Sequence, residues 1–400
     1  MAKLTLGDSS GTPTIVKIKE VPKIKFSASV DTWIGDVDEN GVLQKPTTQT
    51  ALNFTGATEI GSDALSYAFY QRGDITSVDS GSVQTVGVNG LFFAFSNCKG
   101  ITSVDLSSLQ SIGDNGMAYA FEGCTGIISV DLSSLTTVAN NGLYYAFNGC
   151  TGITSVDLCS LQSAGRYGTY YAFEGCTGIT SVDLSSLQTV GGYGMNSSFR
   201  DCTGITSVNL SSLQSVGDYG MQNAFYGCTG LTSVDLSSLQ SVDRNGLHQA
   251  FYGCTGITSA DLSSLATVTV YGLSNAFRGC TGITSVDLSS LTTIGDSGLH
   301  YAFYGCTGIA GALYLSSLQS VGGSGLKSAF QGCSGITSVD LSSLQSVDGT
   351  YGLDTAFRDC TSLTSVDLSS LQSIGKGCMD DSFKGCTGLT TISFPSLTSV

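Results

Sequence analysis

Cys202-Thr-Gly-Ile-Thr-Ser-Val-Asn-Leu-Ser-Ser-Leu-Gln-Ser-Val-Gly-Asp-Tyr-Gly-Met-Gln-Asn-Ala-Phe-Tyr-Gly227 is the stretch that decides the fold, because most of the chain consists of copies of it. Twelve complete copies run from residue 72 to residue 385, and partial copies on both sides extend the repeats over residues 49–400. A fixed period of this length is typical of a solenoid, in which each copy buries its apolar side chains against its neighbours. We therefore expect one solenoid and not several globular domains.

Apolar residues recur at fixed positions of a copy, counted here from its cysteine as position 1. Positions 7 to 9 alternate as in a short strand, and positions 20, 23 and 24 are spaced as on one turn of a helix. We expect an α/β solenoid, with a continuous parallel sheet on one face and short helical turns on the other. Glycines at positions 3, 16, 19 and 26 mark the corners. In the copy that begins at Cys98, the apolar positions 4, 7, 9, 12, 15, 20 and 24 are Ile101, Val104, Leu106, Leu109, Ile112, Met117 and Phe121.

Twelve of the 14 cysteines follow the period of the repeat, and Cys159 and Cys378 lie outside it. The twelve are 26 residues apart from Cys98 to Cys306, and the next three, up to Cys386, follow at intervals of 27, 27 and 26. Single insertions near residues 310–314 and 348–351 explain the longer intervals. Thiols stacked at one position of a coil are most often small buried hydrophobes, and parallel Cβ vectors suit a disulfide poorly. We therefore predict buried free thiols.

Residues 1–48 do not repeat, and we interpret them as a β cap or an anchoring segment. Residues 14–21 and 23–30 alternate apolar and polar side chains, which predicts two half-buried strands. Six of the sixteen basic residues lie in this segment: Lys3, Lys17, Lys19, Lys23, Lys25 and Lys45.

One stretch of this segment, Asp36-Val-Asp38-Glu-Asn40-Gly41, matches the first half of a calcium-binding loop. Asp36, Asp38 and Asn40 are therefore weak candidates for metal ligands. Thr47 occupies the twelfth position, where the loop needs a bidentate acid. We favour the alternative, a hairpin that turns at Asn40-Gly41 between Asp36 and Leu43.

The repeat also resembles a known family. Ile-Thr-Ser-Val-x-Leu, followed by Val-Gly-x-x-Gly-Leu-x-x-Ala-Phe-x-Gly-Cys, is similar to the BspA-like bacterial leucine-rich repeat over about residues 50–400. The resemblance implies a curved solenoid with a parallel sheet. It also implies a family found on bacterial surface proteins that attach to host matrix or to other cells, and in phage genes. The period of 26 residues, and Ser where the family usually has Pro, are departures from its pattern.

Charge and hydropathy limit the classes of partner. The net charge is −15 and only 12% of the residues are charged, so no basic stripe is present that could neutralise nucleic-acid phosphates. No apolar stretch is long enough to cross a bilayer, and the first residues lack the apolar core of a secretory signal. We expect no membrane insertion and an extracellular-facing position on a virion or a cell surface.

Position 8 points out of the sheet face and holds an aspartate in most copies. Stacked about 4.8 Å apart, two such carboxylates repel each other by about 0.9 kcal/mol even in water. Hydrogen bonds from serines two residues before and after each acid are one form of compensation, and divalent cations such as calcium are the other. No cofactor is required, but calcium has weak candidate ligands in Asp105, Asp131, Asp157 and Asp183.

Positions 17, 18, 21, 22 and 25 vary between copies, and sixteen of the seventeen tyrosines lie at 18, 21, 22 or 25. Varied residues suit a surface, so we expect these tyrosines to be exposed, as a recognition surface or as rings that stack to shield the coil. His248 and His300, at position 21, are expected to be solvated, and no nucleophile motif lies beside them. The candidate ligand-binding residues are Tyr119, Tyr144, Tyr145, Tyr170, Tyr171, Tyr193, Tyr219 and Tyr226.

Together these patterns predict a non-enzymatic recognition or adhesion module that binds a bacterial or host surface glycan or protein. A phage tail or another virion part is the expected setting. The alternative is a structural spacer or a self-assembling spine, because an open sheet edge near Val400 invites pairing with another chain. An assembly partner would then bind that edge or the N-terminal segment.

Overall fold

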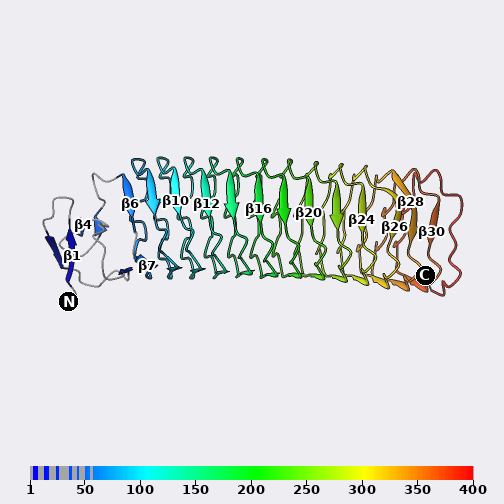
Figure 1. Cartoon of the computed structure of the whole chain (residues 1–400). Coiled ribbons are helices and arrows are strands. Elements are labelled where there is room, and N and C mark those ends of the chain that lie inside the picture. The colour runs from blue at the N-terminus through cyan, green and yellow to red at the C-terminus, as the bar shows by residue number, and fades with distance from the viewer. Residues whose placement is uncertain are drawn as a thin grey trace. The chain divides into compact units, whose positions relative to one another are not determined.

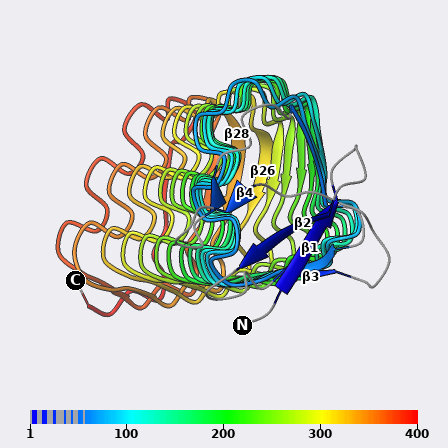
Figure 2. The same ribbon diagram turned by 90° about the vertical axis from the view of Figure 1, so that its left-hand side faces the viewer.

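The computed structural model describes residues 3–7, 13–17, 24–26, 36–37, 43–44, 50–54 and 57–399. The chain divides into two compact units, Met1–Asp183 and Leu184–Val400. Within each unit, every copy of the repeat forms one turn of a parallel-sheet β-solenoid, and successive turns have the same outline (Figures 1 and 2). No described helix is long and apolar enough to cross a membrane.

Each turn in unit 1 supplies one strand to each of two parallel sheets. Residues at the same position of neighbouring copies pair directly, as Val104 does with Val130. The first sheet contains β6 (Ala51–Asn53), β8 (Ser77–Asp79), β10 (Ser103–Asp105), β12 (Ser129–Asp131), β14 (Ser155–Asp157) and β16 (Ser181–Asp183). The second contains β7 (Ala57–Ile60), β9 (Thr85–Val86), β11 (Ser111–Ile112), β13 (Thr137–Val138) and β15 (Ser163–Ala164).

Unit 2 repeats this arrangement, but its first sheet is interrupted where the copy beginning at Cys306 carries an inserted residue. The pairing with the next copy shifts register between Gly311 and Ala312, whose partners are Ile336 and Ser338, and Gly311 has a φ of +85°. The first sheet therefore consists of β18 (Ser207–Asn209), β20 (Ser233–Asp235), β22 (Ser259–Asp261) and β24 (Ser285–Asp287), and separately of β26 (Ala310–Tyr314), β28 (Gly335–Asp340) and β30 (Ser365–Asp367). The second contains β17 (Thr189–Val190), β19 (Ser215–Val216), β21 (Ser241–Val242), β23 (Thr267–Val268), β25 (Thr293–Ile294), β27 (Ser320–Val321), β29 (Ser346–Val347) and β31 (Ser373–Ile374).

Short strands also form before the repeats. β1 (Lys3–Gly7) and β2 (Pro13–Lys17) pair antiparallel, and β3 (Ile24–Phe26) pairs antiparallel with β7. The strands predicted at 14–21 and 23–30 overlap β2 and β3, whereas β1 was not predicted. β4 (Asp36–Val37) pairs antiparallel with β5 (Leu43–Gln44), as the favoured hairpin requires. Asp38 and Asn40, and with them the alternative calcium loop, lie outside the described residues.

The predicted core positions are buried in both units. The phenylalanines at position 24 stack along the coil, with ring centroids 5.3 Å apart for the pair Phe121–Phe147 in unit 1 and 5.4 Å apart for Phe199–Phe225 in unit 2. All 14 cysteines are free, and all except Cys159 are buried, as predicted. The Cys124 Sγ donates a hydrogen bond of 3.1 Å to the carbonyl oxygen of Phe95, so each thiol ties a corner to a neighbouring copy.

The predicted helical turns are wrong, because the described residues contain no helix. Positions 17 to 26 form a run of consecutive turns instead, in which every fourth residue has a positive φ. In the copy that begins at Cys98 these residues are Asn115 (φ 53°), Tyr119 (φ 56°) and Gly123 (φ 68°). One left-handed residue in every four prevents an α-helix from propagating.

Hydrogen bonds between copies stabilise this segment, and they replace the backbone hydrogen bonds that a helix would form. Alternate N–H groups bond within the turn, as in Ala118 N–H to Asn115 O (3.1 Å). The others donate to the next copy, as in Met117 N–H to Gly142 O (2.8 Å) and Tyr119 N–H to Tyr144 O (2.8 Å). The backbone is therefore satisfied without a helix, and the variable side chains stand on a rigid hydrogen-bonded surface.

Candidate functional site

A column of aromatic rings runs along unit 1 at position 22. Tyr67, Phe93, Tyr119, Tyr145 and Tyr171 stack nearly parallel, with ring centroids 5.1, 4.3, 5.2 and 4.8 Å apart in that order. The period of the coil sets this spacing, because one residue of each copy contributes one ring. Each pair contributes about 0.5–1.5 kcal/mol beyond its buried area. The column therefore supports the turn segment behind it.

A second, interrupted column lies beside the first at position 21. Its successive residues are Phe92, Ala118, Tyr144 and Tyr170, and the last two rings stack at 5.2 Å. Ala118 carries no ring where its neighbours Phe92 and Tyr144 do, so the column is interrupted there.

A pocket of about 440 Å³ occupies this place. Its volume lies in the usual range for a small-molecule site, and a lining of aromatic rings with a few polar groups is typical of such sites. The lining residues are Phe92, Asn115, Ala118, Tyr119, Asn141, Tyr144, Tyr167 and Tyr170.

The polar groups of this pocket are neutral amides and phenols. Burial raises the pKa of Tyr119 to about 12, and its charge interaction and hydrogen bond with Tyr144 act in the same direction. Burial also raises the pKa of Tyr170. These two phenols therefore stay protonated at neutral pH and can donate and accept hydrogen bonds. With Asn115 and Asn141 they offer uncharged polar atoms between ring faces.

The structure places the candidate tyrosines in three groups. Tyr119, Tyr144 and Tyr170 line the pocket, whereas Tyr145 and Tyr171 belong to the neighbouring column and do not line it. The other three lie in unit 2, where Tyr193 stacks on Tyr219 (4.6 Å) and Tyr226 stacks on Tyr252 (5.0 Å).

Most of the tyrosines are less exposed than the sequence predicted. The eight candidates are all half-buried, because their rings cover one another along the coil. Among the described residues, the tyrosines classed as exposed are Tyr67, Tyr271, Tyr314 and Tyr351.

Sequence reasoning missed several residues of the pocket: Phe92, Ala118, Asn115 and Asn141. Tyrosines have the chemistry of recognition surfaces, whereas an alanine carries no chemical signal of its own. Comparison of position 21 down the copies would have found it, because Ala118 is the small residue between Phe92 and Tyr144.

The aspartates at position 8 have a structural role in the turn that follows each long strand. Asp105 Oδ1 accepts hydrogen bonds from Ser107 N–H (3.0 Å) and Ser107 Oγ–H (2.7 Å). Asn209 makes the same backbone contact with Ser211 (3.1 Å), which explains why an amide replaces the acid there. The expected bonds to the following serine are therefore present. Among the described residues, no group of three or more His, Cys, Asp and Glu could hold a metal ion.

Substitution of Asp131 tests this role. Asp131 Oδ1 accepts the backbone N–H of Ser133 at 2.9 Å, and Asp131 pairs with Asp157 of the next strand. We expect Asp131→Asn to keep the hydrogen bond, to lose the repulsion, and to be about 1 kcal/mol more stable than Asp131→Ala. Urea unfolding of the two variants measures the difference. Equal stability of Asn and Ala would show that the turn contact contributes nothing.

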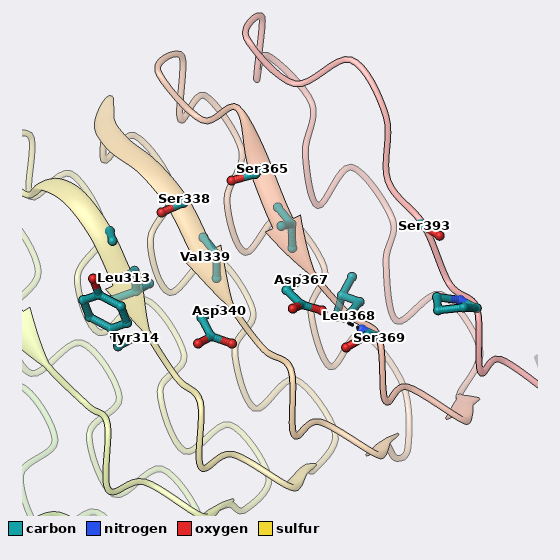
Figure 3. A pocket seen from close by; sticks show the side chains of 13 residues that line it. Leu313, Tyr314, Ser338, Val339, Asp340, Ser365, Asp367, Leu368, Ser369 and Ser393 are labelled. Carbon is teal, nitrogen blue, oxygen red and sulfur yellow. Dashed lines mark hydrogen bonds between the residues drawn. The ribbon is translucent and has the colours of Figure 1, made fainter.

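A second hollow, of about 430 Å³, lies on the sheet face over β26, β28 and β30 of unit 2 (Figure 3). Tyr314, Asp340 and Asp367 lie in one row across these strands because they pair in register. Asp367 Oδ1 accepts the N–H of Ser369 at 2.9 Å. This hollow lacks the converging rings of the pocket in unit 1, so we place the candidate site in unit 1.

The two histidines are not solvated as expected. Both are half-buried in unit 2, and burial lowers the pKa of His248. Burial, followed by the positive charges of Lys327 and Arg278, lowers the pKa of His300 to about 4. His300 is therefore neutral at neutral pH.

The family model of the BspA type leucine-rich repeat region, in 6 copies, matches residues 62–193, 118–223, 194–337 and 273–400. These matches span the repeats of both units. The chain belongs to the BspA-type leucine-rich repeat family. Leucine-rich repeat proteins of this kind are typically interaction or surface-adhesion modules, and the family is generally a non-enzymatic scaffold. No curated protein matches the chain.

One solved leucine-rich repeat structure shares the fold, and two others are reported with it as similar to the chain. A leucine-rich repeat protein from Bacteroides ovatus is 20% identical, with a TM-score of 0.51, over 94% of this chain and 91% of that one. A leucine rich cell surface protein from Faecalibacterium prausnitzii is 17% identical over 98% and 93%, with a TM-score of 0.34. A leucine-rich repeat protein from Eubacterium ventriosum is 20% identical over 87% of each chain, with a TM-score of 0.35.

Proposed function

We propose that the protein is a non-enzymatic recognition module that binds a surface ligand in the pocket at Ala118. The observation that carries this proposal is the pocket of about 440 Å³ where the position 21 column is interrupted at Ala118, with aromatic lining residues from Phe92 to Tyr170. Rigid tyrosines give contact area at a low cost in conformational entropy. The stacked column and the hydrogen-bonded turn segment hold these rings in place before a ligand arrives.

The chemistry of the lining favours an uncharged ligand with both apolar and hydroxyl surface. The negative face of an aromatic ring attracts polarised C–H groups, and neutral amides and phenols exchange hydrogen bonds with hydroxyl groups. A surface glycan has both features, and we propose it as the ligand. A protein loop that inserts one side chain is the second outcome that the experiment must distinguish.

The sharpest test fills the pocket and leaves every tyrosine in place. Ala118→Tyr puts a ring at position 21, as in the neighbouring copies with Tyr144 and Tyr170, so the backbone already accepts it. We expect the melting temperature to stay the same or rise, because the new ring completes the column. Binding to target cells and to a glycan array should fall at least about tenfold, because the site is occupied.

Two further variants separate the pocket from the column. Tyr170→Ser removes a ring that lines the pocket and should also weaken binding. Tyr145→Asn is the matched control, because Tyr145 lies outside the pocket. Its φ of 53° suits an asparagine, since Asn223 has a φ of 55° at the equivalent position. Unchanged binding by Ala118→Tyr, or equal losses in Tyr170→Ser and Tyr145→Asn, would contradict the proposal.

We further propose that the module is displayed on a virion, such as a phage tail, or on a cell surface. Five of the six lysines of residues 1–48 lie in residues 1–25 beside only two acids, and this local positive charge supports docking on an acidic assembly. Immunogold labelling of particles and cells tests the location. The alternative, a self-assembling spine, predicts concentration-dependent association in sedimentation velocity, which a monodisperse monomer would exclude.

A further inference from the structure

Arg278 in unit 2 is held between aromatic rings. Its guanidinium carbon lies 4.9 Å from the ring centroids of Tyr301 and Tyr304 and 5.9 Å from that of Tyr252. Tyr252 and Tyr304 occupy position 25, as Arg278 does, in the preceding and the following copy. The rings therefore cover the faces of the guanidinium and restrict its rotation, and its N–H groups are left at the edge.

Those N–H groups are mostly unused. Nη1 donates to Asn275 Oδ1 at 3.1 Å, and among the described residues no carboxylate lies within ion-pair distance of Arg278. A guanidinium has five N–H donors in a fork that matches the two oxygens of a carboxylate. Arg278 is half-buried, so part of its surface remains accessible to solvent.

Other arginines at position 25 have an acidic partner where Arg278 has none. Arg200 is followed by Asp201, with a nitrogen–oxygen distance of 3.4 Å, and Arg358 is followed by Asp359, at 3.7 Å. Gly279 follows Arg278 at the same position 26. Arg278, which has three tyrosines around it, is therefore the arginine of these three that lacks a neighbouring aspartate.

We propose that Arg278 and the rings around it form a second binding site, specific for the carboxylate group of an acidic sugar or of another small acid. The site is independent of the pocket at Ala118. An incoming carboxylate accepts two N–H groups of the guanidinium, and the phenols of Tyr301 and Tyr304 are placed to contact the remainder of the ligand.

The charges around Arg278 favour an anion. Lys327 is the other cation near His300, and its charge is offset by Asp354, 2.9 Å away. The positive charges of Arg278 and Lys327 also help to hold the pKa of His300 low, although burial is the larger cause. Arg278 is left as an uncompensated positive charge in a chain whose net charge is −15. At contact distance this unpaired charge favours a carboxylate through charge-assisted hydrogen bonds.

The test uses the full chain and follows the Nε–Hε resonance of Arg278 by NMR at constant ionic strength. Sodium glucuronate should shift this resonance in a saturable manner, and glucose should not. Acetate that also saturates would show that the carboxylate alone suffices. A response to glucuronate but not acetate would show that the tyrosines contribute as proposed. Tighter binding of inorganic phosphate than of either carboxylate would overturn the assignment.

Gly279→Asp is the decisive variant, because it restores the missing counter-ion without removing Arg278. Gly279 has a φ of +75°, and a Cβ there meets no atom within 4 Å. Aspartates occupy the equivalent place at Asp201 (φ 58°) and Asp359 (φ 61°). We expect this variant to fold normally and to lose glucuronate binding, measured by ligand-detected NMR, by at least about tenfold.

Arg278→Gln should lose binding to the same extent, and Arg200→Gln is the matched control. Arg200 also lies over a tyrosine, 5.0 Å from the Tyr226 ring, but has Asp201 beside it. Glucuronate binding that survives in a folded Gly279→Asp protein, or that is lost equally in Arg200→Gln, would overturn the proposal.

Discussion

Phe147→Ala should destabilise unit 1 by about 3–5 kcal/mol, one of the two largest effects that we expect from a single substitution. Phe147 has no exposed surface and stacks between Phe121 (5.3 Å) and Phe173 (5.2 Å). The substitution removes one ring from a continuous stack, and the neighbouring copies cannot close the gap because strand pairing fixes their spacing.

Urea unfolding followed by near-ultraviolet circular dichroism measures this loss. Phe147→Leu is the control, because it keeps most of the volume and should cost less than about 1.5 kcal/mol. Hydrogen exchange then locates the damage, which should centre on the adjacent copies because a solenoid copy contacts only its neighbours. A loss below about 1 kcal/mol for Phe147→Ala would mean that the stack is not the main core.

Gly152→Ala should cost at least about 2 kcal/mol, for a different reason. A Cβ at Gly152 would lie 2.5 Å from the carbonyl oxygen of Thr125 and 2.8 Å from that of Ile127. Both atoms belong to the backbone of the preceding copy, so neither can move aside as a flexible side chain would. The two copies would have to separate at this corner.

Gly149→Asn is the matched control for this glycine. Gly149 has a φ of +69° and open space around its Cα, and Asn97 occupies the equivalent position with a φ of 62°. We expect a change within about 0.5 kcal/mol. Thermal melts of the two variants distinguish close packing from backbone conformation. Equal melting temperatures would contradict the close approach at Gly152.

Much of the fold could be predicted from the sequence, because a repeated pattern reports the same environment many times. The apolar positions of the copy that begins at Cys98 are buried, and Asp105 points outward at the expected place. The inserted residue near Ala310 appears as the predicted irregularity. Each of these inferences depended on local alternation or on the period, which the sequence displays directly.

The helical turns could not be excluded in the same way. Positions 20, 23 and 24 are buried in the structure, so the apolar spacing was read correctly and only the backbone was wrong. Positive φ values at Tyr119 and Tyr145 are unusual for a bulky residue, and stacking and bonds to the next copy compensate for them. These compensating contacts are made between copies, so the helix propensities of the residues do not reveal them.

The pocket was missed for a different reason. Ala118 is significant because it carries no ring, and this is visible in the sequence only when it is compared with Phe92 and Tyr144 at the same position of adjacent copies. The charge at Arg278 was present in the sequence, but its setting among three rings required the register of the turn segment.

The hydrogen bonds of the turn segment have a mechanical consequence. Together with the two sheets they give neighbouring copies three belts of bonds along the coil of each unit, except between β24 and β26 in unit 2, where the first sheet is interrupted. A tensile force along the coil would load these belts in parallel, so no single bond would bear it alone. A module that anchors one surface to another under flow experiences this kind of load, and its resistance would be set by the weakest interface between two copies.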